Sequence, residues 1–371
     1  MTAHSCGSRL AVERAGAALR AGTPVLVVNG TDDQAVADVV IAAAHATPHW
    51  TAWLVRFTSG LICAALPARR AEELDLPTMA RDYDSNVEAP TFAVAVDAAS
   101  GIGTGISATD RARTARVLAS DSSRPSDLVR PGHVLPVRVA GCGVLNRRGS
   151  AEATVDLCDT AGLPPVGLTA ALLGEDGELL RDPAVSVFAQ NHRIPVVHVD
   201  NVVHHRLFHG DGRRKRVTLA QNRLVQLADR ALSAVDFEDH LTGARHTVFI
   251  GASVPDIDPP VYVITECVHG DPLLASGCEC RVEFERCHER IAAHGGVIVY
   301  LRPPIISAPR FSVPQPELVA GCITAMLIEL GFTTVTLADY AQHAQLKSGC
   351  ELVVSGPVAT SELRRLSVAT P

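Results

Sequence analysis

The sequence predicts an α/β protein with layered α+β packing and two domains, each a mixed sheet with flanking helices. The chain has 371 residues, more than two domains of roughly 150 residues would need. Hydrophobic residues make up 47% and charged residues 20%, which is enough apolar material for folded cores. Short apolar runs bounded by turn residues alternate with longer stretches of helical character, a pattern typical of sheets covered by helices.

The N-terminal half is divided into elements by its prolines and glycines. Residues 24–28 form an apolar run that begins with a proline and is followed by Asn29-Gly30, which predicts a buried strand. Residues 12–21 predict a helix that ends near Gly22, and residues 33–46 predict a helix capped by Asp32 or Asp33. The same reasoning predicts strands at 60–66, 92–96, 166–173 and 194–199, and helices at 110–120 and 151–161.

A change in composition marks the predicted linker between the domains. Residues 204–216 are polar and basic and contain Gly210-Asp211-Gly212. Beyond this stretch, apolar runs predict strands at 247–251, 261–265 and 297–301, and helical patterns predict helices at 284–294 and 317–331.

Composition also excludes several classes of protein. The net charge of −7 argues against a nucleic-acid binder, and the one basic run, residues 213–216, is short enough to be a solvated linker. No window approaches the roughly 18–20 apolar residues of a membrane span. Residues 1–20 lack an apolar signal core, so the sequence predicts a cytoplasmic protein without a membrane partner. In that compartment the ten cysteines indicate thiols, metal ligands or catalysis rather than disulfides.

The strongest chemical signal is the cysteine cluster Cys267, Cys278 and Cys280. Three thiolates suit a tetrahedral zinc ion and leave one coordination position open for water or substrate. The tight Cys-x-Cys pair implies a turn, and Pro272 and Gly277 supply turn character. The alternative is three small buried residues near that turn; the spacing favours the metal.

These cysteines lie in a longer pattern that resembles GTP cyclohydrolase II. Residues 265–267, 270–271 and 278–280 read T-E-C, G-D and C-E-C, similar to that family's zinc signature. Residues 296–302 resemble its following strand, and residues 325–331 resemble a later helix. The resemblance implies a Zn²⁺ cofactor in the C-terminal domain.

The N-terminal half resembles 3,4-dihydroxy-2-butanone 4-phosphate synthase. Residues 104–111 read T-G-I-S-A-T-D-R, residues 130–136 read R-P-G-H-V-L-P, and residues 143–147 read G-V-L-N-R. Two such domains in this order resemble a bifunctional riboflavin biosynthesis family. The resemblance implies a synthase-like domain at 1–209 and a cyclohydrolase-like domain at 210–371, a homodimer, and a small phosphorylated metabolite as ligand.

The resemblance also implies site residues, carried over from the matching motifs. The catalytic positions are Cys63, His133 and Glu152. The substrate-binding positions are Thr104, Asp110 and Arg147. The metal positions are Cys267, Cys278 and Cys280.

Several positions depart from the family's pattern. Gln34 stands where the synthase has a metal-binding Glu, Ser150 where it has the partner His, and Ala171 where it has a catalytic Glu. These neutral side chains predict weak Mg²⁺ binding in the N-terminal domain. After Arg302, residues 303–309 replace the loop with which the cyclohydrolase helps to bind GTP.

Three functions remain open at this point. The first is a riboflavin-pathway enzyme that makes 3,4-dihydroxy-2-butanone 4-phosphate from ribulose 5-phosphate and opens the ring of GTP. The second is a non-catalytic scaffold or regulatory partner. The third is a repurposed enzyme that acts on a related sugar phosphate or nucleotide, for example in secondary metabolism.

Overall fold

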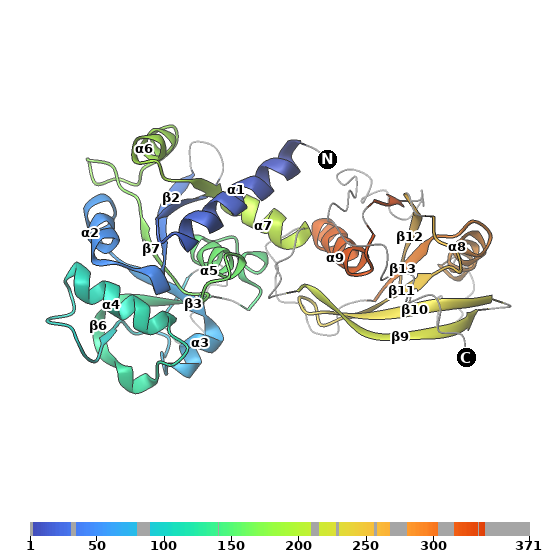
Figure 1. Ribbon diagram of the computed structural model, residues 1–371, viewed down its shortest axis with the longest axis horizontal. Coiled ribbons are helices and arrows are strands. Elements are labelled where there is room, and N and C mark those ends of the chain that lie inside the picture. Colours follow the sequence, from blue (N-terminus) through green and yellow to red (C-terminus); the bar gives the residue numbers. More distant parts are fainter. Residues whose placement is uncertain are drawn as a thin grey trace. The chain divides into compact units, whose positions relative to one another are not determined.

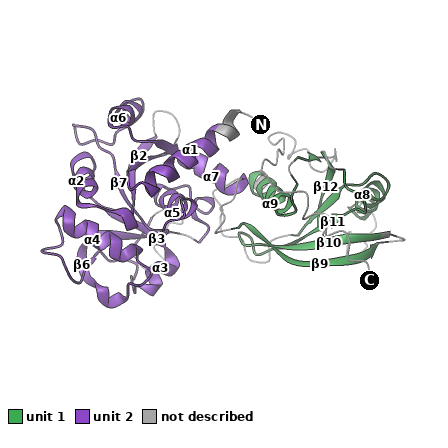
Figure 2. Cartoon of the chain, viewed as in Figure 1, with its two compact units in different colours: residues 1, 214–371 green, residues 2–213 purple. Residues whose placement is uncertain are grey.

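A computed structural model describes residues 3–30, 35–79, 90–139, 141–208, 215–227, 230–255, 258–267, 280–302, 315–332 and 334–337. The chain divides into two compact units (Figure 2). One comprises residues 2–213, and the other comprises residue 1 with residues 214–371. Both units combine a mixed sheet with flanking helices, as the sequence predicts.

The described strands of the N-terminal unit form one eight-stranded sheet in the order β4-β6-β3-β7-β2-β1-β8, with β5 paired to β6. The pairs β1–β8 and β3–β6 are parallel, whereas β2 and β7 run antiparallel to their neighbours. The strands are β1 (Val25–Asn29), β2 (Val36–Ala42), β3 (Cys63–Pro67), β4 (Thr91–Phe92), β5 (Val96–Ala98), β6 (Leu128–Val139), β7 (Gly167–Ala171) and β8 (Val196–His198).

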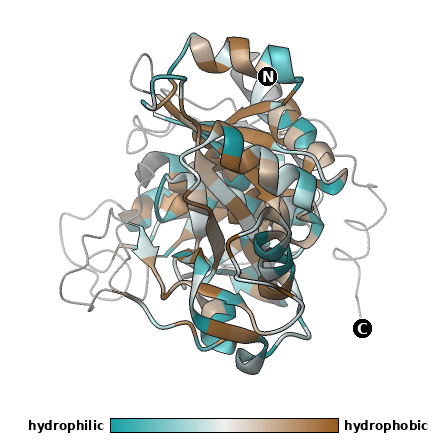
Figure 3. Cartoon of the chain, turned by 90° about the vertical axis from the view of Figure 1, so that its left-hand side faces the viewer, coloured by the Kyte–Doolittle hydropathy of each residue, from teal (hydrophilic) through white to brown (hydrophobic). Residues whose placement is uncertain are grey.

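Helices cover both faces of this sheet (Figure 1). On one face, β3 packs Ala64 and Leu66 into the main core with residues of α2, α4 and α6. On the other face, Ala65 packs with Val155 of α5, and α5 contacts α1 and α7. Figure 3 shows the largely apolar strands of this unit enclosed by helices with mixed surfaces. The helices are α1 (Ala3–Arg20), α2 (Pro48–Phe57), α3 (Ala68–Glu73), α4 (Ala108–Ala119), α5 (Ser150–Thr160), α6 (Ala184–His192) and α7 (Val199–Phe208).

Two local predictions are wrong in this unit. The helix predicted at 33–46 is instead strand β2 followed by a short 3₁₀ turn, Ala43–His45. The β-branched run of β2 pairs on both sides, with β1 and with β7, and this tertiary pairing overrides its helical pattern. Its predicted caps, Asp32 and Asp33, lie outside the described residues. The linker predicted from His204 also begins too early, because α7 buries Val203 and Leu207 and continues to Phe208.

The C-terminal unit has a second mixed sheet in the order β14-β12-β13-β11-β10-β9. Its strands are β9 (Val217–Leu227), β10 (Arg230–Asp239), β11 (Arg245–Ile250), β12 (Pro260–Thr265), β13 (Val297–Leu301) and β14 (Thr336–Leu337). Helix α9 (Gln315–Glu329) packs on one core cluster of this sheet and helix α8 (Cys280–His294) on another. The β9–β10 pair was not predicted from the sequence, because polar residues interrupt the apolar pattern of both strands.

No helix among the described residues combines the length and the apolar character that crossing a membrane requires.

Candidate functional site

Strand register brings the first group of predicted site residues to one face of the N-terminal sheet. Cys63 of β3 pairs with Thr169 of β7, and Asp38 of β2 pairs with Ala171 of β7. Paired residues project to the same face, and so do residues two apart along a strand. All four side chains, those of Cys63, Asp38, Thr169 and Ala171, therefore lie on the face of the sheet that α5 covers, near the C-terminal end of β7.

His133 reaches the same region from β6 and is held by a carboxylate from β5. Leu135 of β6 pairs with Cys63, and His133 lies two residues before it. The His133 ring nitrogen Nδ1 lies 2.6 Å from Asp97 Oδ2, and the His133 backbone N–H donates to Asp97 Oδ1 at 3.0 Å. Asp97 is 4% exposed, whereas the His133 side chain is 39% exposed. Asp97 thus holds one edge of the imidazole, and part of the ring remains accessible to solvent.

The loop that contains Thr104 is anchored by Asp110. The Asp110 carboxylate accepts hydrogen bonds from the backbone N–H groups of Gly103 and Gly105, at 3.2 and 3.1 Å. Ser107 caps α4 by accepting from the Asp110 backbone N–H. Burial raises the pKa of Asp110, but the hydrogen bonds from Gly103, Ser107 and Gly105 outweigh it and the net pKa is lowered. Asp110 therefore shapes the loop as an anion, and Thr104 is exposed on it.

Arg147 and Glu152 form a buried ion pair at the start of α5. Arg147 Nε and Nη2 lie 2.8 and 2.5 Å from Glu152 Oε1. Glu152 is 1% exposed, and its second oxygen, Oε2, has no hydrogen-bond partner among the described residues. Burial raises the pKa of Glu152 more than the Arg147 charge lowers it. A Cβ at Gly149 would lie 2.3 Å from Oε2, so this carboxylate needs a glycine beside it.

Ser150, the first residue of α5, lies beside Asp38. Burial raises the pKa of Asp38, and the Ser150 and Thr169 hydroxyls oppose that shift. The Thr169 hydroxyl makes no hydrogen bond of normal geometry within the described structure, so it acts on the carboxylate only at longer range. Burial, followed by the Asp38 charge, raises the pKa of Cys63 to about 11. The Cys63 side chain is consequently a neutral thiol at pH 7, a weak donor rather than a nucleophile.

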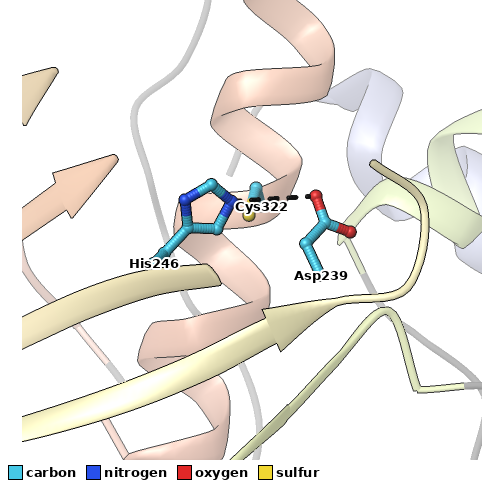
Figure 4. A group of neighbouring side chains, drawn as sticks. All are labelled: Asp239, His246 and Cys322. Carbon is cyan, nitrogen blue, oxygen red and sulfur yellow. Dashed lines mark ion pairs between the residues drawn. The ribbon is translucent and has the colours of Figure 1, made fainter. Parts of the chain in front are cut away.

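A second polar cluster lies in the C-terminal unit, where Asp239, His246 and Cys322 are all buried (Figure 4). One ligand atom from each lies within 4.8 Å of the others, which is near the spacing of a metal site. The Arg302 backbone N–H donates to His246 Nδ1 at 3.1 Å. In the neutral ring this leaves the proton on Nε2, the nitrogen that faces Asp239 Oδ2 at 3.9 Å. A protonated nitrogen cannot bind a metal ion.

The charge around this second cluster also opposes a cation. The Arg216 guanidinium lies 3.5 Å from Asp239 Oδ2, and its side chain is 7% exposed. Burial raises the pKa of Asp239, but His246, Arg216 and neighbouring donors outweigh it and hold the pKa far below its usual range. Burial raises the pKa of Cys322, whose thiol donates to Asp239. We therefore interpret the group as a hydrogen-bonded ionic network that joins β10, β11 and α9.

Of the three predicted zinc ligands, the structure describes two. Cys267 lies two residues after β12, and Cys280 is the first residue of α8. Both are half-buried, and Cys278 lies outside the described residues. Cysteine thiolates are the donors that zinc prefers, and both described residues are of that type. The described part of this donor set fits zinc.

Comparison with known proteins gives the chain its family. The family model of 3,4-dihydroxy-2-butanone 4-phosphate synthase matches residues 13–205, and that of GTP cyclohydrolase II matches residues 220–305. The riboflavin biosynthesis protein RibBA of Salinispora arenicola is 36% identical over 295 residues, which cover 78% of this chain and 69% of that protein. The chain belongs to the bifunctional riboflavin biosynthesis family. RibBA of Nocardia farcinica is 35% identical over 296 residues, covering 78% and 70% of the two chains.

Solved structures agree with this membership of the riboflavin biosynthesis family. A 3,4-dihydroxy-2-butanone 4-phosphate synthase in complex with two magnesium ions is 34% identical, with a TM-score of 0.50 over 54% of this chain and 98% of that one. The two-domain synthase RibBX from A. baumannii matches 94% of this chain and 99% of its own, with a TM-score of 0.63. At 24% identity, RibBX supports the fold alone.

Asp97 of the N-terminal site was not predicted from the sequence. A lone acidic residue in the apolar run 94–98, just before the glycine-rich loop, was the available signal, because a charge there must be paired when buried. Asp239 and His246 were also missed. Gln34 lies outside the described residues.

Proposed function

We propose that the N-terminal unit binds a small phosphorylated sugar and that its synthase turnover with Mg²⁺ is weak. The observation that carries this proposal is the side chain at the start of α5. Ser150 places a hydroxyl beside Asp38, at the position where the family has its metal-binding His. Ribulose 5-phosphate is the first ligand to test, because the resemblance implies it.

The chemistry of the donor set supports the weak-metal part of the proposal. Mg²⁺ prefers carboxylate oxygens in near-octahedral geometry, and a neutral serine hydroxyl is a poor replacement for a ligating side chain. Gln34 adds a second neutral group at a family ligand position. When bound, a magnesium ion would polarise the substrate's oxygens. Among the described residues of β2, β3 and β7 on the α5 face of the sheet, Asp38 is the carboxylate that could bind this ion.

The basic side of the site supports phosphate binding. Arg147 is followed by the N-terminus of α5, whose cap residue Gly149 supplies no side-chain acceptor for the first N–H groups. A guanidinium beside such a helix end is a common phosphate site. Both interactions that Arg147 makes with Glu152 go to one oxygen, so its other donors can bind a phosphate. Thr104 and His133 would then contact the sugar, and Asp110 would hold the loop that carries Thr104.

For the C-terminal unit we propose a zinc ion held by Cys267, Cys278 and Cys280, with weak GTP turnover. The ion would stabilise the segment between β12 and α8, and bound water would supply hydroxide if substrate reached it. The family's homodimer and the cytoplasmic location stay predictions. A scaffold or regulatory role, or an activity on a related sugar phosphate or nucleotide, stays the alternative.

The deciding experiment restores the missing ligands. We expect the wild type with Mg²⁺ to convert ribulose 5-phosphate far more slowly than the roughly 1–1000 s⁻¹ typical of enzymes. The double variant Gln34→Glu, Ser150→His should gain Mg²⁺-dependent turnover of at least about 10-fold, and Ser150→Ala should gain none. Calorimetry with ribulose 5-phosphate tests binding separately. Ordinary turnover by the wild type would overturn the proposal.

A further inference from the structure

We propose that Asp97 is a positioning residue that locks the His133 ring with Nδ1–H toward itself, so that Nε2 faces the ligand. The inference rests on the proposed function only for the identity of that ligand. The tautomer itself is a property of the protein alone.

The contact between the two side chains has the geometry of a charge-assisted hydrogen bond. The Nδ1–Oδ2 distance of 2.6 Å is at the short end of such bonds. The backbone N–H of His133 binds the other oxygen, Oδ1, at 3.0 Å, so one residue occupies both oxygens of Asp97. An ionised carboxylate only accepts hydrogen bonds, and therefore Nδ1 must be the donor.

The backbone around the pair is shaped to fit it. The pairing of β5 with β6 shifts register between Val96 and Asp97, an irregularity that re-aims a side chain. Gly105 has φ +92°, and a Cβ there would lie 2.0 Å from Asp97 Oδ2 and 2.7 Å from His133 Nδ1. A Cβ at Gly132 would lie 2.0 Å from the Val96 carbonyl carbon. Two glycines in separate segments thus leave room for this one contact.

The exposure of the two partners argues for a functional role. Burying a carboxylate costs free energy that an ion pair with a partly exposed partner repays poorly. Asp97 is 4% exposed, whereas the His133 side chain keeps 39% of its surface accessible. Two charged groups of α4 lie near the pair: Asp110 interacts with His133, and Arg111 interacts with Asp97. A buried carboxylate that binds one ring nitrogen determines which nitrogen of the partly exposed imidazole is left accessible to a ligand.

The test reads the tautomer directly by ¹⁵N NMR of histidine-labelled full-length protein, at a pH where the ring is neutral. His133→Gln identifies the His133 signals by their loss. In the wild type we expect His133 to be predominantly the Nδ1–H tautomer. In Asp97→Asn the ratio of Nδ1–H to Nε2–H should fall at least about 10-fold, the effect expected for loss of a hydrogen bond to a charged group. Asp121→Asn, an exposed acid on another turn, should leave the ratio unchanged.

The outcomes separate this inference from the proposed function. If the wild-type spectrum shows His133 as the Nε2–H tautomer, the positioning role is wrong. This measurement needs no variant, so the test does not depend on whether Asp97→Asn folds. An unchanged tautomer in folded Asp97→Asn also overturns it. Adding ribulose 5-phosphate to the wild type should shift the His133 Nε2 signal. If the tautomer is as expected but ribulose 5-phosphate neither shifts that signal nor binds by calorimetry, the positioning role stands and the proposed ligand is wrong.

Discussion

Arg147 places two nitrogen donors on a single oxygen of Glu152, at 2.8 and 2.5 Å, while the other oxygen of that buried carboxylate has no partner among the described residues. The ion pair therefore holds the guanidinium beside the start of α5, and the Glu152 charge offsets part of the positive charge of Arg147. If phosphate binds at Arg147 as proposed, this unpartnered buried oxygen would limit how tightly the anion binds.

This relationship predicts the effect of Glu152→Gln. Removing the negative charge should strengthen binding of inorganic phosphate by roughly 5- to 10-fold, since about 1 kcal/mol of repulsion between the carboxylate and the anion is lost. Calorimetric titration with phosphate measures this change. Arg147→Gln is the matched variant and should abolish binding. Equal affinities for wild type and Glu152→Gln would show that the anion binds elsewhere.

The Cys63 thiol offers a second prediction. Burial and then the Asp38 charge raise its pKa to about 11. Asp38→Asn removes the second cause only, so the thiol pKa should fall but stay above the ordinary value. Iodoacetamide should then alkylate Cys63 several-fold faster at pH 8 in Asp38→Asn than in the wild type, as read by peptide mass spectrometry. Cys142 serves as the internal control, and an unchanged Cys63 rate would contradict the electrostatic link.

The ionic network of the C-terminal unit predicts a pH dependence of stability. Because the folded-state pKa of Asp239 is far below its unfolded value of about 3.9, the unfolded chain binds more protons as the pH falls. The stability from Asp239 is therefore fully present above roughly pH 4–5 and is lost as the pH falls through the folded-state pKa. Asp239→Asn should lower the free energy of unfolding by about 3–5 kcal/mol at pH 7, because Arg216 keeps a buried, unpaired charge.

Urea unfolding followed by circular dichroism at pH 7 and pH 3 measures both effects on the C-terminal transition. Glu238→Gln alters the neighbouring acid on the same strand and should change stability by less than about 1 kcal/mol. A loss of stability in Asp239→Asn that is the same at pH 3 as at pH 7 would mean that the carboxylate charge is not its cause.

Zinc content distinguishes the two cysteine-containing groups of the C-terminal unit. The purified full chain should carry one zinc ion, which the triple variant with Cys267, Cys278 and Cys280 changed to Ser should lose. Cys322→Ser should retain the ion. Cys322 lies beside His246, whose Nε2 carries a proton and therefore cannot bind zinc. Atomic absorption on dialysed protein measures both. Loss of zinc from folded Cys322→Ser would overturn our interpretation of the buried cluster.

Much of the site was predictable because its parts are local. The helix predicted at 110–120 corresponds to α4, and the one at 151–161 to α5, since each is a local run of helix-forming residues. The motifs that carry Thr104, His133 and Arg147 are contiguous stretches of sequence. Residues 33–46 were harder, because their pattern suits a helix until β1 and β7 pair with both edges of the strand.

The sequence by itself determined the class of the fold, the family-like motifs and the replacement of two metal-ligand positions, a Glu and a His, by Gln34 and Ser150. These follow from residue identity and short-range pattern alone. Only the tertiary structure decided which carboxylates meet which partners. Asp97 reaches His133 from 36 residues away, and Asp239 meets Cys322 on a distant helix. Such partners depend on strand register and on glycines that allow close approach, and burial then makes each pairing obligatory.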